Sequence, residues 1–236
     1  MIVRMGNQTW LVAHRGDPTR APENTLVSYR KAVAKGARAV ETDVRRLRDG
    51  VWVAFHDPDL KRTTGFRGLV AKSRWQEVRT LDAGGDRIPR IGEVLDFCRR
   101  RGVRLFLDLK VSGHEKELLR ILHDSRWLHR VWVGAGSVAG LQRWKRALAG
   151  RQGLPLFWVT GYRAPLTEGR IAQARRLGLS GFVAYKRWVT KAAARRVREA
   201  GLKLFVWTVR TPRELRKFSL WGVDGIMSEV WPPPSI

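Results

Sequence analysis

The chain has 236 residues, 44% of them hydrophobic, so it can enclose one large core and is neither a disordered nor a membrane-spanning chain. Its 46 lysine and arginine residues against 21 acidic ones give a formal net charge of +25, which attracts polyanions such as nucleic acid, anionic membranes or phosphorylated small molecules. Because the arginines are spread over many segments, a solvated basic surface without such a partner is an equal alternative.

The first third of the chain alternates short apolar runs with turn residues. Residues 10–14 (WLVAH) predict a strand, and residues 22–36 predict an amphipathic helix that opens at Pro-Glu-Asn-Thr and ends at a glycine. Strand 39–44 comes next, and an Asp-Gly turn joins it to a further strand at 51–55. Residues 58–89 predict irregular, glycine-rich chain.

From residue 91 onward the pattern is regular, because each amphipathic helix is followed by a nearly continuous apolar strand. After a short helix at 73–79, the expected helices cover residues 91–101, 114–123, 138–148, 167–177, 190–200 and 211–219. The expected strands cover residues 103–109, 131–134, 154–159, 181–185, 203–208 and 223–227. Apolar strands that alternate with helices predict a parallel sheet covered on its outer face, and the closed form of that sheet is the TIM (β/α)8 barrel.

Nine predicted strands are one too many for that barrel. The strand at 51–55 returns after too few residues for a parallel crossover connection. We therefore predict an α/β fold: a single TIM-barrel domain over residues 1–236, with a small insertion after strand 2 at about residues 45–90. This insertion carries His56 over the mouth of the barrel.

Polar side chains stand at the C-terminal ends of the first three barrel strands, where the active sites of TIM barrels lie. His14 ends the first strand, Glu41 and Asp43 the second, and Asp108 and Lys110 the third. Three converging carboxylates repel one another unless a cation or protons neutralise them, and oxygen ligands suit Mg²⁺ or Ca²⁺. A salt-bridge network with the many arginines is the alternative.

Two histidines, His14 and His56, accompany this carboxylate cluster. A lone histidine is more often a structural hydrogen-bonding residue, but two beside carboxylates favour an acid–base pair, because imidazole titrates near neutral pH. Arg15, Arg62 and Lys110 are donors suited to a phosphate. A cation, two histidines and phosphate-binding donors together favour displacement at phosphorus, in which the leaving oxygen needs a proton.

The stretch from residue 14 to residue 65, HRGDPTRAPENT…ETDVRRLRDGVWVAFHDPDLKRTTG, closely resembles the opening signature of glycerophosphodiester phosphodiesterases. The resemblance continues through IPRIGEVL, FLDLK and GLKLFVWTVRTPRELRKFSLWGVDGIMSE, so it covers nearly the whole chain. It implies a TIM barrel with a small insertion after strand 2, in agreement with the strand count.

The resemblance also implies roles for individual residues. It implies a divalent metal ion with three carboxylate ligands, namely Glu41, Asp43 and Asp108. It implies that His14 and His56 are the general acid and base. It implies three substrate-binding residues, with Arg15 and Lys110 on the phosphate and Trp207 lining the pocket floor or the glycerol side.

The sequence departs from the residues usual in the family at three places. The third metal ligand is usually glutamate, and Asp108 is one methylene shorter, so the ion would shift, be bridged by a water or bind less tightly. The usual Ser-Phe pair after the following strand is Ser137-Val138, and the closing Thr-Asp is Ser228-Glu229. None of these changes removes a catalytic group.

We therefore expect a metal-dependent phosphodiesterase that hydrolyses glycerophosphodiesters to sn-glycerol 3-phosphate and an alcohol. One alternative is the same chemistry on membrane lysophospholipids, of the lysophospholipase D type, with the basic surface bound to an anionic membrane. A non-catalytic anion-binding or nucleic-acid-binding protein is disfavoured, because every expected acid–base and metal position is filled. No separate apolar segment opens the sequence, and Cys98 is its single cysteine, so we expect a cytoplasmic location with peripheral membrane contact as an option.

Overall fold

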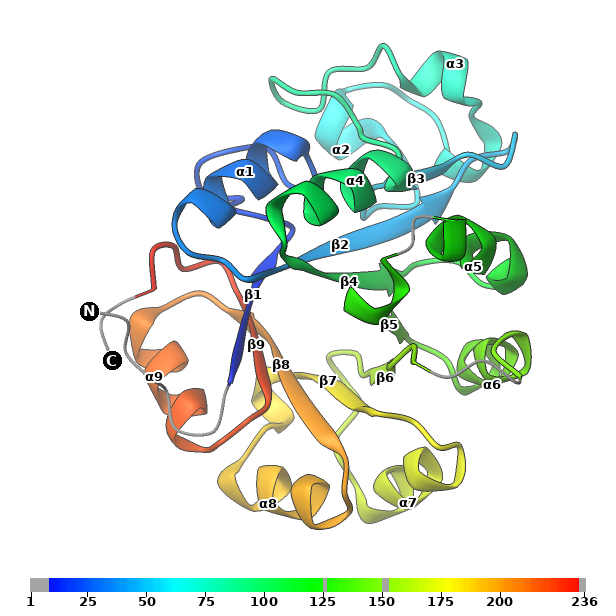
Figure 1. Cartoon of the computed structure of the whole chain (residues 1–236). Coiled ribbons are helices and arrows are strands. Elements are labelled where there is room, and N and C mark those ends of the chain that lie inside the picture. The colour runs from blue at the N-terminus through cyan, green and yellow to red at the C-terminus, as the bar shows by residue number, and fades with distance from the viewer. Residues whose placement is uncertain (1–8, 125–126, 150–152, 234–236) are drawn as a thin grey trace.

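A computed structural model describes residues 9–124, 127–149 and 153–233, and within them eight parallel strands form a closed ring (Figure 1). In ring order these strands are β1 (Trp10–His14), β2 (Ala39–Arg46), β4 (Arg104–Leu109), β5 (Val131–Ala135), β6 (Leu156–Val159), β7 (Gly181–Tyr185), β8 (Lys203–Val209) and β9 (Gly225–Ser228). Because β1 pairs with both β2 and β9, the ring closes, and the predicted TIM barrel is confirmed.

The extra strand lies outside this ring. β3 (Trp52–Ala54) pairs antiparallel with residues 44–46 of β2, so it is the strand that the count had singled out. This pairing lengthens β2 two residues beyond its predicted end at residue 44. Within the ring, β2 pairs with β4 only up to Val44, so Asp43 lies near the C-terminal end of the barrel part of the strand and Glu41 lies two residues before it.

Helices cover the outer face of the barrel (Figure 1). The principal ones are α1 (Leu26–Ala34), α4 (Ile91–Arg101), α5 (Glu115–Asp124), α6 (Val138–Ala147), α7 (Glu168–Arg176), α8 (Lys191–Glu199) and α9 (Pro212–Leu220), with short 3₁₀ turns η2 (Leu128–Arg130) and η3 (Lys186–Trp188). Serine or threonine side chains cap the N-termini of five of them, at positions 25, 137, 167, 190 and 211. In the described part of the chain, no helix has the length and apolar character needed to cross a membrane.

The apolar interior is divided into a layer inside the barrel and a layer between barrel and helices. Inside the barrel, the rings of Phe106, Phe157 and Phe205 lie 5.0–6.1 Å apart between centroids. Gly134 makes room for them, since a Cβ there would lie 2.8 Å from the Phe106 ring. The barrel is therefore filled below its mouth, and only the C-terminal ends of the strands are open to substrate-sized molecules.

Residues 47–90, called the insertion below, fold beside the C-terminal end of β2 (Figure 1). They contain α2 (Lys61–Thr64), the 3₁₀ turn η1 (Val70–Lys72) and α3 (Trp75–Val78), and they enclose a small apolar cluster of their own, which includes Leu60, Val70 and Val78. The short helix predicted at 73–79 is present as α3, whereas α2 was missed because its four residues, KRTT, carry no apolar period. That residues 1–236 form one domain stays a prediction.

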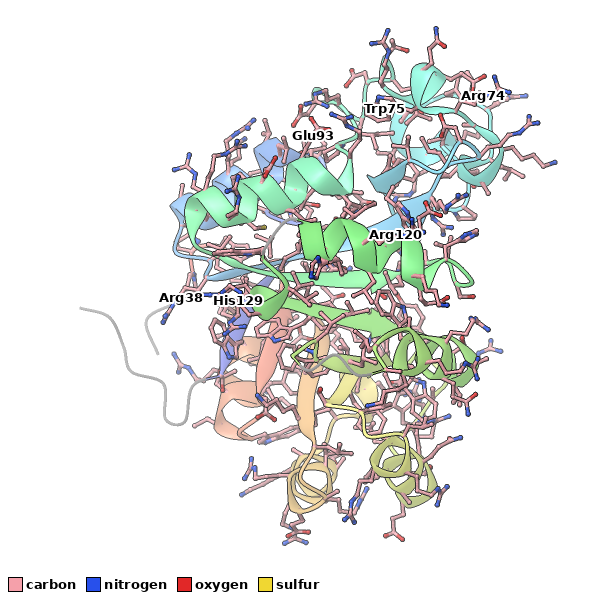
Figure 2. The ribbon with its side chains drawn as sticks, turned by 45° about the vertical axis from the view of Figure 1, so that its right-hand side comes forward. Arg38, Arg74, Trp75, Glu93, Arg120 and His129 are labelled. Atoms are coloured by element: carbon pink, nitrogen blue, oxygen red, sulfur yellow. The ribbon has the colours of Figure 1, made fainter. Side chains whose placement is uncertain are left out.

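Basic side chains are spread over the outside of the molecule. Figure 2 shows nitrogen-tipped side chains on the helices and on the insertion, with Arg120 on α5 and Arg74 at the outer edge of the insertion. Arg38 and His129 lie at the N-terminal end of the barrel strands, where both backbone carbonyls accept hydrogen bonds from Arg104. For most of the surface, this distribution agrees with the solvated alternative that the sequence left open.

Candidate active site

The loop after β1 places the first histidine and arginine at the mouth. His14 is the last residue of β1, and Arg15 and Gly16 follow with φ angles of +55° and +91°. Only glycine fits the second of these positions, because a Cβ there would lie 2.3 Å from Ser28 Oγ. The turn directs the Arg15 backbone N–H to Glu41 Oε2, at 2.9 Å, and so ties the loop to β2.

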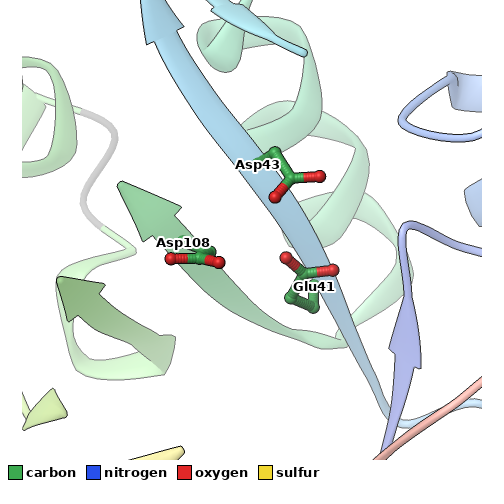
Figure 3. Close-up of side chains that lie close together, drawn as sticks. All are labelled: Glu41, Asp43 and Asp108. Carbon is green, nitrogen blue, oxygen red and sulfur yellow. The ribbon is translucent and has the colours of Figure 1, made fainter. Parts of the chain in front are cut away.

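Glu41, Asp43 and Asp108 converge as predicted (Figure 3). One carboxylate oxygen from each lies within 4.8 Å of the others, and strand register explains why: Asp43 on β2 is paired with Asp108 on β4. Glu41 and Asp43 are buried, while Asp108 is half-buried. The shorter side chain of Asp108 still reaches the cluster.

Two cations partly neutralise this cluster. Lys110 Nζ lies 2.9 Å from Asp43 and 2.6 Å from Asp108, and Arg15 Nε lies 2.9 Å from Asp43 Oδ2 without the alignment of a hydrogen bond. Burial alone would raise the pKa of Asp43, but Lys110 and Arg15 hold it well below its usual range. The pKa of Lys110 is correspondingly raised, because Asp108 and Asp43 outweigh its burial.

Among the described residues, no lysine or arginine side chain forms an ion pair with Glu41, which accepts only the Arg15 backbone N–H at 2.9 Å. Burial, and then the charges of Asp43 and Asp108, raise its pKa well above the ordinary value. Three carboxylates against Lys110 and Arg15 leave one negative charge to be balanced, by a proton on Glu41 or by a bound cation. Carboxylate oxygens with an excess negative charge suit a divalent ion such as Mg²⁺ or Ca²⁺. The residues present therefore fit the metal that the resemblance implies.

Asn24 orients Asp43 and was not predicted as a site residue. Its Nδ2 donates to Asp43 Oδ2 at 2.8 Å, and its Oδ1 accepts from the Asp43 backbone N–H and from Thr42 Oγ1, both at 3.1 Å. It holds φ +60°, a conformation that asparagine tolerates better than most residues. The signal was present in the PENT sequence, which we interpreted as the start of a helix and as part of the family signature, without assigning a role to Asn24.

His14 is paired with a carboxylate from the other end of the chain. His14 Nδ1 lies 3.0 Å from Glu229 Oε1, and Arg210 Nε donates to Glu229 Oε2 at 2.7 Å. Although burial opposes ionisation, the hydrogen bonds from His14 and Arg210 lower the pKa of Glu229 to about 2. Glu229 is therefore ionised at neutral pH and holds the imidazole in place.

His56 has a similar arrangement on the insertion. Its Nδ1 lies 2.6 Å from Asp57 Oδ1, and Asp57 also accepts from Arg62 Nε. Burial would raise the pKa of Asp57, but hydrogen bonds from Arg62 and His56 lower it. Arg62 also binds Glu23, so this predicted phosphate donor already holds two carboxylates.

These groups face one cavity of about 570 Å³ at the mouth of the barrel. Seven of the eight residues to which the resemblance assigns a role line it: His14, Arg15, Glu41, His56, Asp108, Lys110 and Trp207, and Arg62 lines it as well. The eighth, Asp43, is buried behind Arg15 and Lys110. Trp207 packs against Tyr162 at a ring distance of 5.1 Å, so these two rings give the cavity an aromatic wall in addition to its charged lining.

Fold and site together define a TIM barrel with two carboxylate-paired histidines and three clustered carboxylates at its mouth. The family model for the glycerophosphoryl diester phosphodiesterase family matches residues 14–230. The chain therefore belongs to this family, whose members are phosphoric diester hydrolases, as the resemblance had indicated.

Individual relatives are similar over nearly their whole length. The glycerophosphodiester phosphodiesterase of Caldanaerobacter subterraneus is 28% identical over 235 residues, covering 94% of each chain. A crystal structure of a putative glycerophosphoryl diester phosphodiesterase from Silicibacter pomeroyi superposes with a TM-score of 0.84 at 26% identity, covering 96% of this chain and 91% of that one. An Oleispira antarctica phosphodiesterase, solved in complex with the product sn-glycerol-3-phosphate, gives a TM-score of 0.84 at 25% identity, covering 95% and 94%.

Proposed function

We propose that the protein is a metal-dependent phosphodiesterase that hydrolyses glycerophosphodiesters to sn-glycerol 3-phosphate and an alcohol. The observation that carries this proposal is the meeting of two carboxylate-paired histidines with a three-carboxylate cluster in a single cavity. Family membership and the product named for the Oleispira antarctica phosphodiesterase support the same substrate class.

His14 and His56 are the proposed general acid and base. Glu229 accepts a hydrogen bond from Nδ1 of His14, and Asp57 accepts one from Nδ1 of His56. Nδ1 of each ring therefore carries a proton, and Nε2 is the atom available for proton transfer. One Nε2 takes the proton of the attacking hydroxyl as the new O–P bond forms. The other histidine starts as an imidazolium and gives its Nε2 proton to the leaving alkoxide as the old P–O bond breaks.

The attacking hydroxyl can come from water or from the glycerol of the substrate. In the second case a cyclic glycerol phosphate forms and water then opens it, with the proton-transfer roles of the two histidines reversed. Both routes consume one water and release sn-glycerol 3-phosphate and the alcohol.

Arg15 and Lys110 are the proposed phosphate-binding residues, and Trp207 the glycerol-side wall. Both cations line the cavity while anchored by carboxylates, so their charges are positioned before the substrate arrives. A divalent cation held by Glu41, Asp43 and Asp108 would neutralise charge on the phosphate oxygens. We propose Mg²⁺ or Ca²⁺ for this position.

Hydrolysis of glycerophosphocholine by the purified protein, followed with Mg²⁺, Ca²⁺, Mn²⁺ and chelator, tests the proposal. Chelation should abolish turnover, and the variants His14→Ala and His56→Ala should each lose about 10²–10⁴-fold in kcat. His129→Ala is the matched control, since this exposed histidine lies at the opposite end of the barrel. Near-wild-type turnover by both active-site variants would overturn the proposal.

A further inference from the structure

Exposed apolar side chains gather at the end of the molecule that carries the mouth. Among the described residues, four large hydrophobic side chains are markedly exposed: Phe66 (43%), Leu69 (45%), Tyr162 (63%) and Leu220 (75%). The first two belong to the insertion, and Tyr162 lines the cavity. Leu220 ends α9 and lies toward the N-terminal end of the barrel strands.

The loop with Phe66 and Leu69 is held beside the active site. It follows directly on α2, whose Arg62 lines the cavity. A bridge between Asp59 and Leu69, and a hydrogen bond from the Leu60 N–H to the Gly68 carbonyl, fasten the loop to the segment that follows His56. Phe66 and Leu69 are therefore a fixed part of the rim.

The same segment is strongly basic. Residues 60–80 contain six lysines and arginines against one acid, Glu77. Lys61, Arg67 and Lys72 are exposed, and in the described part of the chain none of their charged side-chain groups forms an ion pair with a carboxylate, since Asp59 accepts only from the Lys61 backbone N–H. We call Lys61, Phe66, Arg67, Leu69 and Lys72 the rim patch.

We propose that the rim patch docks the enzyme on the surface of an anionic phospholipid membrane. Unpaired cations are attracted to anionic head groups, and exposed aromatic and aliphatic side chains beside them enter the boundary between head groups and acyl chains. A nucleic acid could also bind to the cations, but the apolar side chain of Leu69 offers it no hydrogen bond. The net charge of +25 favours the same partner.

Membrane docking extends the proposed function to a further substrate, and this extension rests on the proposed function. A membrane-bound rim patch places the mouth against the lipid surface, where phosphodiesters with one acyl chain, the lysophospholipids, present their head groups. Tyr162 and Trp207 then offer the apolar wall of the cavity to the lipid side of the substrate. The substrate class inferred is a membrane-embedded lysophospholipid, in addition to soluble glycerophosphodiesters.

Cosedimentation of the full chain with vesicles tests the docking directly. Vesicles of phosphatidylcholine alone are compared with equimolar phosphatidylcholine and phosphatidylglycerol, at low and high salt. The wild type should bind the anionic vesicles and not the neutral ones. Phe66→Ser with Leu69→Ser, and Arg67→Glu with Lys72→Glu, should each weaken binding about tenfold or more.

Two matched controls lie on α9, away from the mouth. Leu220→Ser removes a more exposed apolar side chain, and Arg216→Glu reverses an exposed charge. Both should bind like the wild type. Equal binding to neutral and anionic vesicles, an equal loss in the controls, or binding of an oligonucleotide at a salt concentration that prevents vesicle binding would each overturn the docking.

Turnover of soluble glycerophosphocholine separates this inference from the proposed function. All rim-patch variants should keep wild-type turnover of the soluble substrate while losing turnover of lysophosphatidylcholine in anionic vesicles. A wild type that binds anionic vesicles but hydrolyses neither substrate would overturn the proposed function and leave the docking intact. A wild type that hydrolyses the soluble substrate but binds no vesicles would overturn the docking alone.

Discussion

The pairing of Glu229 with His14 predicts that a neutral residue at position 229 impairs proton transfer. Glu229→Gln keeps the size of the side chain and its hydrogen-bonding capacity, but removes the negative charge 3.0 Å from His14 Nδ1. The imidazolium formed during turnover then loses its counter-ion. The amide can also turn its N–H₂ toward the ring and favour the wrong tautomer.

The size of the effect follows from the geometry. For unit charges 3.0 Å apart and an effective dielectric constant near 20, Coulomb's law gives about 5.5 kcal/mol. Arg210 binds the same carboxylate and roughly halves this attraction, which leaves about 2–3 kcal/mol. The expected loss in kcat is therefore about 10²-fold.

Steady-state kinetics with glycerophosphocholine across pH measure this loss. We expect the change in kcat, with KM nearly unchanged, because Glu229 acts through His14. Glu229→Asp should restore part of the activity, and Glu168→Gln, which alters an exposed carboxylate on α7, should have none of these effects. A folded Glu229→Gln protein with wild-type kcat at every pH would show that His14 does not depend on this carboxylate.

Three further predictions concern the loop and the carboxylate cluster. Gly16→Ala should lower the free energy of unfolding, measured in urea titrations, by about 2–3 kcal/mol, because residue 16 has a φ of +91° and the new Cβ would collide with Ser28. Gly36→Ala is the matched control: it has a similar φ of +94° but open space around the Cβ, and it should cost about 1 kcal/mol. The pKa of Glu41 is raised in the folded protein, so its ionisation destabilises the fold as pH rises above about 4.5. Glu41→Gln should therefore stabilise the metal-free protein at neutral pH by about 1–2 kcal/mol. The same variant should abolish the rise in Tm that Mg²⁺ or Ca²⁺ gives the wild type. Equal urea midpoints with and without the substitution would contradict this. Lys110→Met leaves Asp43 and Asp108 without their ammonium partner and should cost about 3 kcal/mol of stability and at least about 10²-fold in kcat, measured in the same assays.

The architecture was largely predictable because it depends on local periodicity. Each strand and helix of the βα repeat is encoded by the spacing of apolar residues within about ten positions, and the extra strand β3 was identified from a connection too short for a parallel crossover. Most of the candidate site followed from the same reasoning, since polar residues near the ends of parallel strands share one mouth. Asn24, Glu229 and Arg210 were given no role, although Glu229 was noted as a departure from the family, because the role of each depends on a partner far along the chain.

The sequence by itself determined the βα order and the types of chemical groups at the mouth, because both follow from residue identity and from patterns along the chain. Only the tertiary structure decided which charge neutralises which. Glu229 meets His14 across 215 positions, and Arg15 and Lys110 reach Asp43 from different strand ends. Such pairings depend on the closure of the barrel and on strand register, which bring together groups that no local pattern connects.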